Sequence, residues 1–230
     1  MNIAIITARK NSKRIKNKNI KNFHGKPIIA WSILNAHKSK LFSNVIVSTD
    51  SKEIARIAKK YGAEVPFFRP KNISGDKTPT RKVMLHAINW LEKNDYKFQN
   101  VCCLYPTAPL LKHTDLVKAF NILKKNKDKY TFSACKYSYP IQRAFYLAKE
   151  GTKIVFSKNH KKFTQNFKDT YHDAGQFYFA HKDTYRKNIT IFSKKAIPII
   201  FPHQKVQDID NIEDWKICEQ KFKILKIIEK

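Results

Sequence analysis

Residues 2–13 have the sequence NIAIITARKNSK, an apolar run followed at once by a basic loop. A continuous apolar run of this length is typical of a strand that is buried on both faces of a parallel sheet. We therefore expect Asn2–Ala8 to form such a strand. Open α/β sheets bind ligands beyond the carboxyl ends of their strands. The loop that begins at Arg9 is therefore expected at a ligand site.

Strand-like and helix-like segments alternate along the rest of the chain. The expected strands are Val45–Ser48, Val101–Leu104, Gly175–Ala180 and Ala196–Phe201, and the expected helices run from Pro27 to about Ser39, from the cap Thr49-Asp50-Ser51 to Gly62, from Thr80 to about Lys93 and onward from about Asn211. The helical segments carry apolar residues three or four positions apart, as in Ile29, Ile33 and Ala36. This alternation predicts an α/β fold whose mostly parallel sheet is covered on both faces.

A chain of 230 residues suits one domain, so we expect a single domain over residues 1–230. The regular pattern loosens between Lys136 and Asp173, and we interpret residues 136–173 as a small protruding subdomain within that domain. This segment is rich in aromatic residues for a loop: Tyr137, Tyr139, Phe145, Tyr146, Phe156 and Phe163. Exposed apolar surface of this kind usually marks an interface, and we expect a homodimer.

The formal net charge of +28 raises the alternative of a basic nucleic-acid-binding protein. The lysines are spread over every segment, however, and no zinc-finger spacing or RNA-recognition aromatic pair accompanies them, so no specific nucleic-acid partner is expected. The four cysteines show no Cys-x-x-Cys spacing and suit reduced core thiols. The apolar run at residues 2–8 is far too short to span a membrane. We expect a cytoplasmic protein.

Two groups of residues suggest chemistry on phosphates. Arg9, Ser12, Lys13 and Lys18 offer hydrogen-bond donors to phosphate, and charge-assisted bonds of this type are worth about 1.5–3 kcal/mol each. Asp208 and Asp210 precede the last helix and offer hard oxygen ligands of the kind that Mg²⁺ prefers. A solvated turn with a helix cap is the alternative for this acidic pair.

Several segments taken in order resemble the CMP-sialic acid synthetase family of cytidylyltransferases. They are Ala8-Arg9, Ser12-Lys13, Lys18-Asn19-Ile20, Gly25-Lys26-Pro27, Val47-Ser48-Thr49-Asp50, Tyr61-Gly62-Ala63-Glu64-Val65-Pro66, Phe68-Arg69-Pro70 and Asp208-Ile209-Asp210. Within the family, residues 104–109, 140–143 and 171–178 are most similar to the pseudaminic acid branch. The resemblance implies a Rossmann-like three-layer nucleotidyltransferase fold, and a dimer whose protruding subdomains help to complete the partner's sugar site.

The resemblance also implies a reaction. The anomeric hydroxyl of an acidic nine-carbon sugar would attack the α-phosphorus of CTP, and pyrophosphate would leave. It assigns Arg9, Ser12, Lys13, Lys18, Asn19 and Arg69 to the nucleotide, assigns Asp208 and Asp210 to Mg²⁺, and makes Arg9, Lys13, Asp208 and Asp210 the catalytic set. Pseudaminic acid is the expected sugar, and an N-acylneuraminate, legionaminate or the eight-carbon acid Kdo are the alternatives.

The sequence departs from the family pattern at two places. Lys10-Asn11 stands where the family usually has small residues, often two glycines, so the backbone is expected to approach phosphate differently. Tyr105 stands where the family often has Gln, close to the sugar site, which argues against N-acetylneuraminate itself.

The remaining candidates concern the sugar. Tyr105, Gln142, Arg143, His172, Asp173 and Gln176 form the expected substrate-binding set. Gln142 and Arg143 could hold the sugar carboxylate or its amides, because an Arg fork suits a carboxylate. A surface strand is the alternative there. His172 beside Asp173 resembles an oriented base, and a structural histidine is the alternative.

Overall fold

A six-stranded sheet lies at the centre of the computed structural model, which describes residues 1–159 and 162–228. Its strands are β1 (Asn2–Thr7), β4 (Asn44–Ser48), β5 (Asn100–Leu104), β6 (Tyr130–Lys136), β9 (Tyr171–His181) and β10 (Ala196–Phe201). They are arranged in the order β10-β6-β9-β5-β1-β4. Only β9 runs antiparallel to its neighbours β5 and β6 in this sheet, and the other pairings are parallel. The expected mostly parallel sheet is confirmed.

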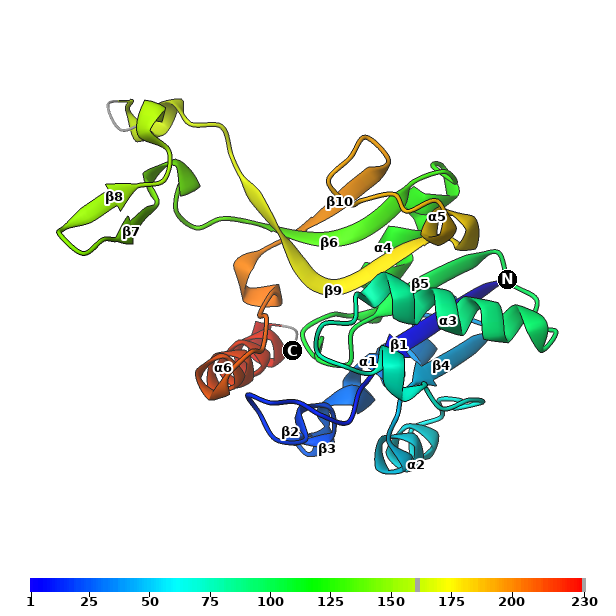
Figure 1. Ribbon diagram of the computed structural model, residues 1–230. Coiled ribbons are helices and arrows are strands. Elements are labelled where there is room, and N and C mark those ends of the chain that lie inside the picture. The colour runs from blue at the N-terminus through cyan, green and yellow to red at the C-terminus, as the bar shows by residue number, and fades with distance from the viewer. Residues whose placement is uncertain (160–161, 229–230) are drawn as a thin grey trace.

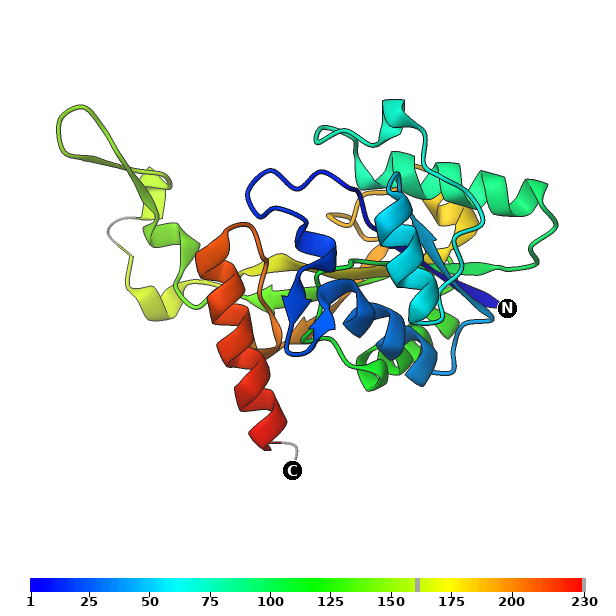
Figure 2. The same cartoon turned by 90° about the horizontal axis from the view of Figure 1, so that it is seen from below.

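Helices cover both faces of the sheet, which gives three layers (Figure 2). They are α1 (Ile28–Lys38), α2 (Lys52–Lys60), α3 (Thr80–Lys93), α4 (His113–Lys124), α5 (Lys182–Arg186) and α6 (Ile212–Ile228). Apolar side chains of α1, α2 and α4 form one core cluster with the sheet, whereas those of α3 and α5 form a second cluster on the other face. Helix α6 packs apart from both against the small β2–β3 hairpin (Asn22–Phe23, Lys26–Pro27), around the buried ring of Phe23.

The segment between β6 and β9, residues 137–170, is here called the arm; residues 160 and 161 within it lie outside the described part of the chain. It carries the short hairpin β7–β8 (Phe145–Leu147, Thr152–Ile154), which lies away from the sheet beyond the ends of β6 and β9 (Figure 1). Its apolar side chains are strongly exposed, as in Tyr139 (83%), Leu147 (82%) and Phe163 (73%).

Single 3-10 turns complete the described chain: η1 (Lys18–Ile20), η2 (Lys71–Ile73), η3 (Ile141–Arg143), η4 (Ser157–Asn159), η5 (Thr164–Asn166) and η6 (His203–Lys205). Within the described residues, no helix combines the length and the apolar content needed to cross a bilayer.

Candidate active site

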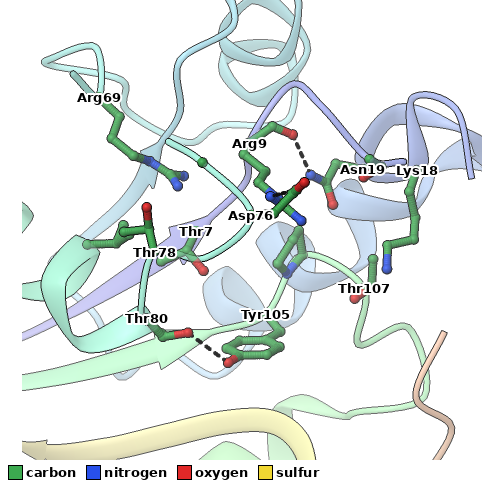
Figure 3. A pocket seen from close by; sticks show the side chains of 14 residues that line it. Thr7, Arg9, Lys18, Asn19, Arg69, Asp76, Thr78, Thr80, Tyr105 and Thr107 are labelled. Carbon is green, nitrogen blue, oxygen red and sulfur yellow. Dashed lines mark hydrogen bonds and ion pairs between the residues drawn. The ribbon is translucent and has the colours of Figure 1, made fainter. Parts of the chain in front are cut away.

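A cavity of about 270 Å³ lies at the carboxyl ends of β1 and β5 (Figure 3). Its lining comes from four segments that are distant in the sequence: Thr7, Arg9, Ser12, Lys18 and Asn19; Arg69; Gly75, Asp76, Thr78, Thr80 and Val83; and Tyr105, Pro106 and Thr107. Five of the six residues that we expected to contact a nucleotide are among them. The sixth, Lys13, is mostly exposed and lies at the outer side of the same loop.

The basic loop after β1 is held in place by its own backbone and side chains. The amide of Ala8 donates to the carbonyl of Ser48 at 3.0 Å, which continues the pairing of β1 with β4. Asn17 adopts a left-handed φ of 55°, which asparagine tolerates better than most residues, and so lets the chain turn into η1. The buried side chain of Asn19 then donates to the carbonyl of Arg9 at 2.9 Å. The loop therefore needs no glycine to present Arg9 to the cavity.

The cationic ends of Arg9 and Lys13 converge on one carboxylate. The Arg9 guanidinium pairs with Asp76, and Lys13 Nζ lies 2.7 Å from the same carboxyl group. The two cations hold the pKa of Asp76 below its ordinary value, with the hydrogen bond from Lys13 as the largest cause. An anion that bound to Arg9 and Lys13 would therefore have to compete with Asp76.

Arg69 lies at the other end of the cavity from Lys18 (Figure 3). Its side chain is buried, and Nη2 donates to the carbonyl of Ser48 at 2.5 Å. Burial lowers the pKa of this guanidinium to about 10, although the negative charge of Asp50 opposes the shift. Within the described residues Nε has no hydrogen-bond partner. Arg69 thus keeps one buried donor that a ligand could use.

The acidic pair adjoins the cavity through Lys18. The Lys18 ammonium donates to the carbonyl of Ile209 at 2.5 Å, between the two aspartates, and Asp210 pairs with Arg14 at 2.5 Å. Desolvation, and next the negative charge of Asp210, raises the pKa of Asp208 above its ordinary value. A bound cation would relieve this repulsion.

The donor set near this pair is small. Among residues 1–159 and 162–228 there is no cluster of three or more His, Cys, Asp or Glu side chains placed to hold a metal. Two carboxylates fit a hard cation whose other ligands are water and phosphate oxygens, which is what Mg²⁺ prefers.

Tyr105 forms one wall of the cavity below Thr80 (Figure 3). Its hydroxyl lies 3.0 Å from Thr80 Oγ1, and its ring centroid lies 5.7 Å from that of Tyr178 on β9. Tyr178 in turn donates to the carboxylate of Asp173. Burial raises the pKa of Tyr105 to about 12, so this wall is a neutral hydrogen-bonding surface at physiological pH. Asp173 does not line the cavity itself and contacts the wall through its hydrogen bond with Tyr178.

The other residues that we expected at a sugar lie outside the cavity lining. His172 lies at the base of the arm with its ring tilted against that of Tyr137, the ring centroids 5.0 Å apart, and its Nδ1 lies 2.9 Å from the backbone carbonyl of Asp173. The Asp173 carboxylate accepts from Tyr178 and Gly175. The geometry thus does not show the carboxylate-oriented base that the adjacent residues suggested.

Gln142 and Arg143 belong to η3 in the arm. Arg143 donates to the carbonyl of Lys162 at 2.6 Å and lies over the ring of Phe167, and Gln142 faces the carbonyl of Lys168 at 3.5 Å. Both residues therefore make contacts within the arm. Gln176 is buried on β9 and donates to the carbonyl of Lys205 at 2.6 Å.

Residues 75–80, which contribute Asp76, Thr78 and Thr80 to the cavity, were not among the site residues predicted from the sequence. The short polar run Ser-Gly-Asp-Lys-Thr-Pro-Thr at residues 74–80, directly before a helix, was the available signal. It was missed because it follows no recognised strand.

A family profile described as Cytidylyltransferase matches residues 3–228 of the chain. The chain belongs to the cytidylyltransferase family. A pseudaminic acid cytidylyltransferase of Campylobacter jejuni subsp. jejuni serotype O:2 is 41% identical over 224 residues, which cover 97% of this chain and 97% of that protein. An N-acylneuraminate cytidylyltransferase of Escherichia coli O18:K1:H7 is 30% identical over 94% of this chain and 51% of its own length.

A solved structure agrees with the cytidylyltransferase fold. The CMP:2-keto-3-deoxy-manno-octonic acid synthetase complexed with CTP superposes with a TM-score of 0.68, covering 100% of this chain and 99% of that one, at 12% identity. This likeness shows the fold alone. The resemblance inferred from the sequence motifs is confirmed by the family match and by the relatives.

Proposed function

We propose that this cytidylyltransferase transfers CMP from CTP to the anomeric hydroxyl of an acidic nine-carbon sugar, pseudaminic acid or a close stereoisomer, and releases pyrophosphate. The substrate assignment rests on the 41% identity, over nearly the full length of both chains, to a pseudaminic acid cytidylyltransferase. A relative at 33% identity is named a CMP-N,N'-diacetyllegionaminic acid synthase, so legionaminic acid is the nearest competing substrate.

The residues of the cavity are placed to hold a nucleoside triphosphate in one orientation. Arg9, Ser12 and Lys13 would hold the β- and γ-phosphates once Asp76 has been displaced, and Lys18 would contact the α-phosphate near the acidic pair. Asn19 would act by keeping the carbonyl of Arg9, and with it the loop, in place. Arg69, whose Nε is unsatisfied, would take a polar group of the nucleoside at the far end. Such placement favours reaction mainly through alignment and charge neutralisation.

The acidic pair would bind a divalent cation at the end of the cavity where we place the phosphates. Asp208 and Asp210 would hold Mg²⁺, which supplies electrophilic activation of the α-phosphate when it is bound. Lys18 lines the cavity beside the pair, and Arg14 pairs with Asp210, so both cations would limit the local build-up of negative charge. Lys13 and Arg9 would stabilise the departing pyrophosphate.

The sugar would lie against the Tyr105 wall, with Thr80 and Tyr178 fixing the tyrosine hydroxyl and ring. Gln142 and Arg143 lie in the arm and His172 lies on β9 at its base, and none of the three lines the cavity of its own chain. They fit a sugar site only if the arm of a second copy reaches it. The exposed apolar side chains of the arm support a homodimer of this kind.

The experiment that tests this function is a substrate panel. Pyrophosphate release is measured with CTP, UTP, ATP and GTP, each with pseudaminic, legionaminic and N-acetylneuraminic acids and Kdo. We expect CTP with pseudaminic acid to give the highest kcat/KM. Turnover of Kdo or N-acetylneuraminic acid at an equal kcat/KM would overturn the substrate assignment.

The same panel includes an oligonucleotide arm, because the high positive charge suggested nucleic acid. Weak binding that disappears with added salt, and no effect on pyrophosphate release, is the result that we expect.

A further inference from the structure

Residues 205–210, here called the strap, carry the acidic pair, and side chains from several elements hold their backbone carbonyls. The carbonyl of Lys205 accepts from Gln176 on β9 (2.6 Å), that of Val206 from Lys221 on α6 (2.7 Å), that of Asp208 from Gln207 (3.1 Å) and that of Ile209 from Lys18 (2.5 Å). Three of these four bonds come from outside the strap, from Gln176, Lys221 and Lys18, and they anchor its backbone to other elements.

Lys221 holds the strap at two points. Besides the Val206 carbonyl, its ammonium donates to Gln207 Oε1 at 2.9 Å. The amide nitrogen of Gln207 then donates to the carbonyl of Asp208. Lys221 is therefore linked to the backbone of Asp208 through one side chain. Lys221 is half-buried, and its ammonium is held by the two bonds to the strap.

The strap is also fixed through its apolar side chains. Val206 and Ile209 are buried in two different core clusters. At the end of the strap, Asp214 accepts from the amides of Asp210 at 2.9 Å and Asn211 at 3.0 Å. These contacts leave the carboxylates of Asp208 and Asp210 as the partly solvent-facing groups of an otherwise fixed segment.

We propose that Lys221 is a positioning residue that sets the backbone of the strap so that the carboxylates of Asp208 and Asp210 are preorganised for a divalent cation. This inference rests on the proposed metal role of the pair. Lys221 touches neither the cation nor the nucleotide cavity. It acts by reducing the conformational freedom that the strap would otherwise lose when a cation binds.

The test compares three variants in α6. Lys221→Met keeps most of the apolar stem and removes both hydrogen bonds, Lys221→Arg retains donors, and Lys223→Met removes an exposed lysine on the same helix. Binding of Mn²⁺ to the enzyme alone is measured by electron paramagnetic resonance. The Mg²⁺ activation constant for pyrophosphate release and the Kd for CTP without metal are measured alongside.

We expect Lys221→Met to weaken Mn²⁺ binding and to raise the Mg²⁺ activation constant by roughly tenfold, in the range known for residues that orient metal ligands. The Kd for CTP without metal should stay within about twofold of the wild type, because the phosphate loop lies on other elements. Lys221→Arg should recover most of the loss, and Lys223→Met should behave as wild type. Gln207→Met breaks only the second link and should give a smaller effect in the same direction.

Two outcomes overturn the inference. One is unchanged Mn²⁺ binding in Lys221→Met and Gln207→Met while Asp208→Asn abolishes it. The other is an equal loss of metal-free CTP binding, which would mean that Lys221 only supports the fold. Should Asp208→Asn itself leave Mn²⁺ binding unchanged, the metal role in the proposed function fails, and Lys221 has no pair to position. If Lys221→Met does not fold, Gln207→Met and Lys221→Arg decide the question.

Discussion

The guanidinium of Arg9 pairs with the carboxylate of Asp76 inside the cavity where the nucleotide is expected. Asp76 comes from the segment before α3, and Lys13 approaches the same carboxyl group at 2.7 Å. The two cations are thus arranged around one negative charge. On the proposed function, a triphosphate would have to exchange with the Asp76 carboxylate when it binds.

Asp76→Asn should strengthen CTP binding, because the cations lose an internal competitor but keep a polar neighbour. The pair is partly exposed to solvent, so we expect a modest decrease in Kd, roughly two- to fivefold. Calorimetric titration with CTP in the absence of Mg²⁺ measures the change. Weaker binding in this variant would mean that Asp76 organises the loop more than it competes with phosphate.

Arg9→Ala should lower kcat/KM by a factor that corresponds to roughly 2–4 kcal/mol, if Arg9 stabilises charge that develops on the departing pyrophosphate. Steady-state kinetics with varied CTP gives this number. Lys16→Ala, a change to an exposed lysine of the same loop, is the matched control. Wild-type constants for Arg9→Ala would contradict the assigned role.

Much of the fold could be predicted from local sequence. The apolar run Asn2–Ala8 identified a buried strand and Ala196–Phe201 a strand, and β1 and β10 form there, β10 as a partly exposed edge strand. Helix α4 and strand β6 were not predicted. The segment Tyr130–Lys136 includes the polar residues Thr131 and Ser133, which weaken its strand pattern. Both are fully buried, because their hydroxyl groups form hydrogen bonds to the backbone of the neighbouring strand β9. The reversed direction of β9 could not be predicted either, since strand direction depends on tertiary pairing.

Part of the cavity lining could be predicted from a local motif. The donor pattern of the basic loop pointed to Arg9, Ser12 and Lys18, the family resemblance added Asn19, and all four line the cavity. The contacts of Gln176 could not be predicted from the local sequence. Its side chain lies under the strap, bonded to a carbonyl 29 residues away, which no spacing rule could indicate.

Asp208→Asn and Asp210→Asn should each reduce turnover by orders of magnitude at saturating Mg²⁺, because each removes one carboxylate of the pair proposed to hold the metal. Thermal unfolding should change little, since both side chains are partly solvent-facing. Initial rates across a Mg²⁺ series measure the effect. Full activity in both variants would rule out the acidic pair as the metal site.

Tyr105→Phe should raise the KM for the sugar severalfold and leave that for CTP near the wild-type value. The change removes the hydroxyl that lies 3.0 Å from Thr80 Oγ1 but keeps the ring against Tyr178. Tyr105→Gln should shift the kcat/KM ratio between pseudaminic and N-acetylneuraminic acid toward the latter. Competition assays with both sugars report this ratio, and an unchanged ratio would place the sugar elsewhere.

Removal of the β7–β8 hairpin, with Phe145 and Leu147 among its exposed side chains, should convert a dimer into a monomer. The shortened protein should still bind CTP, because no described residue of the arm lines the cavity. Sugar turnover should be lost if the partner's arm completes the sugar site. Light scattering and calorimetry measure the two properties. An intact protein that is monomeric and fully active would exclude both the dimer and the shared site.

The most direct test of the proposed reaction follows the phosphorus atoms of CTP. The enzyme is incubated with Mg²⁺, pseudaminic acid and CTP labelled at the α-phosphate, and the products are separated and identified by mass spectrometry. We predict that the label appears in a CMP-sugar, in a one-to-one ratio with unlabelled pyrophosphate and only when the sugar is present. Label that appears as free CMP or CDP while the sugar is recovered unchanged would contradict it.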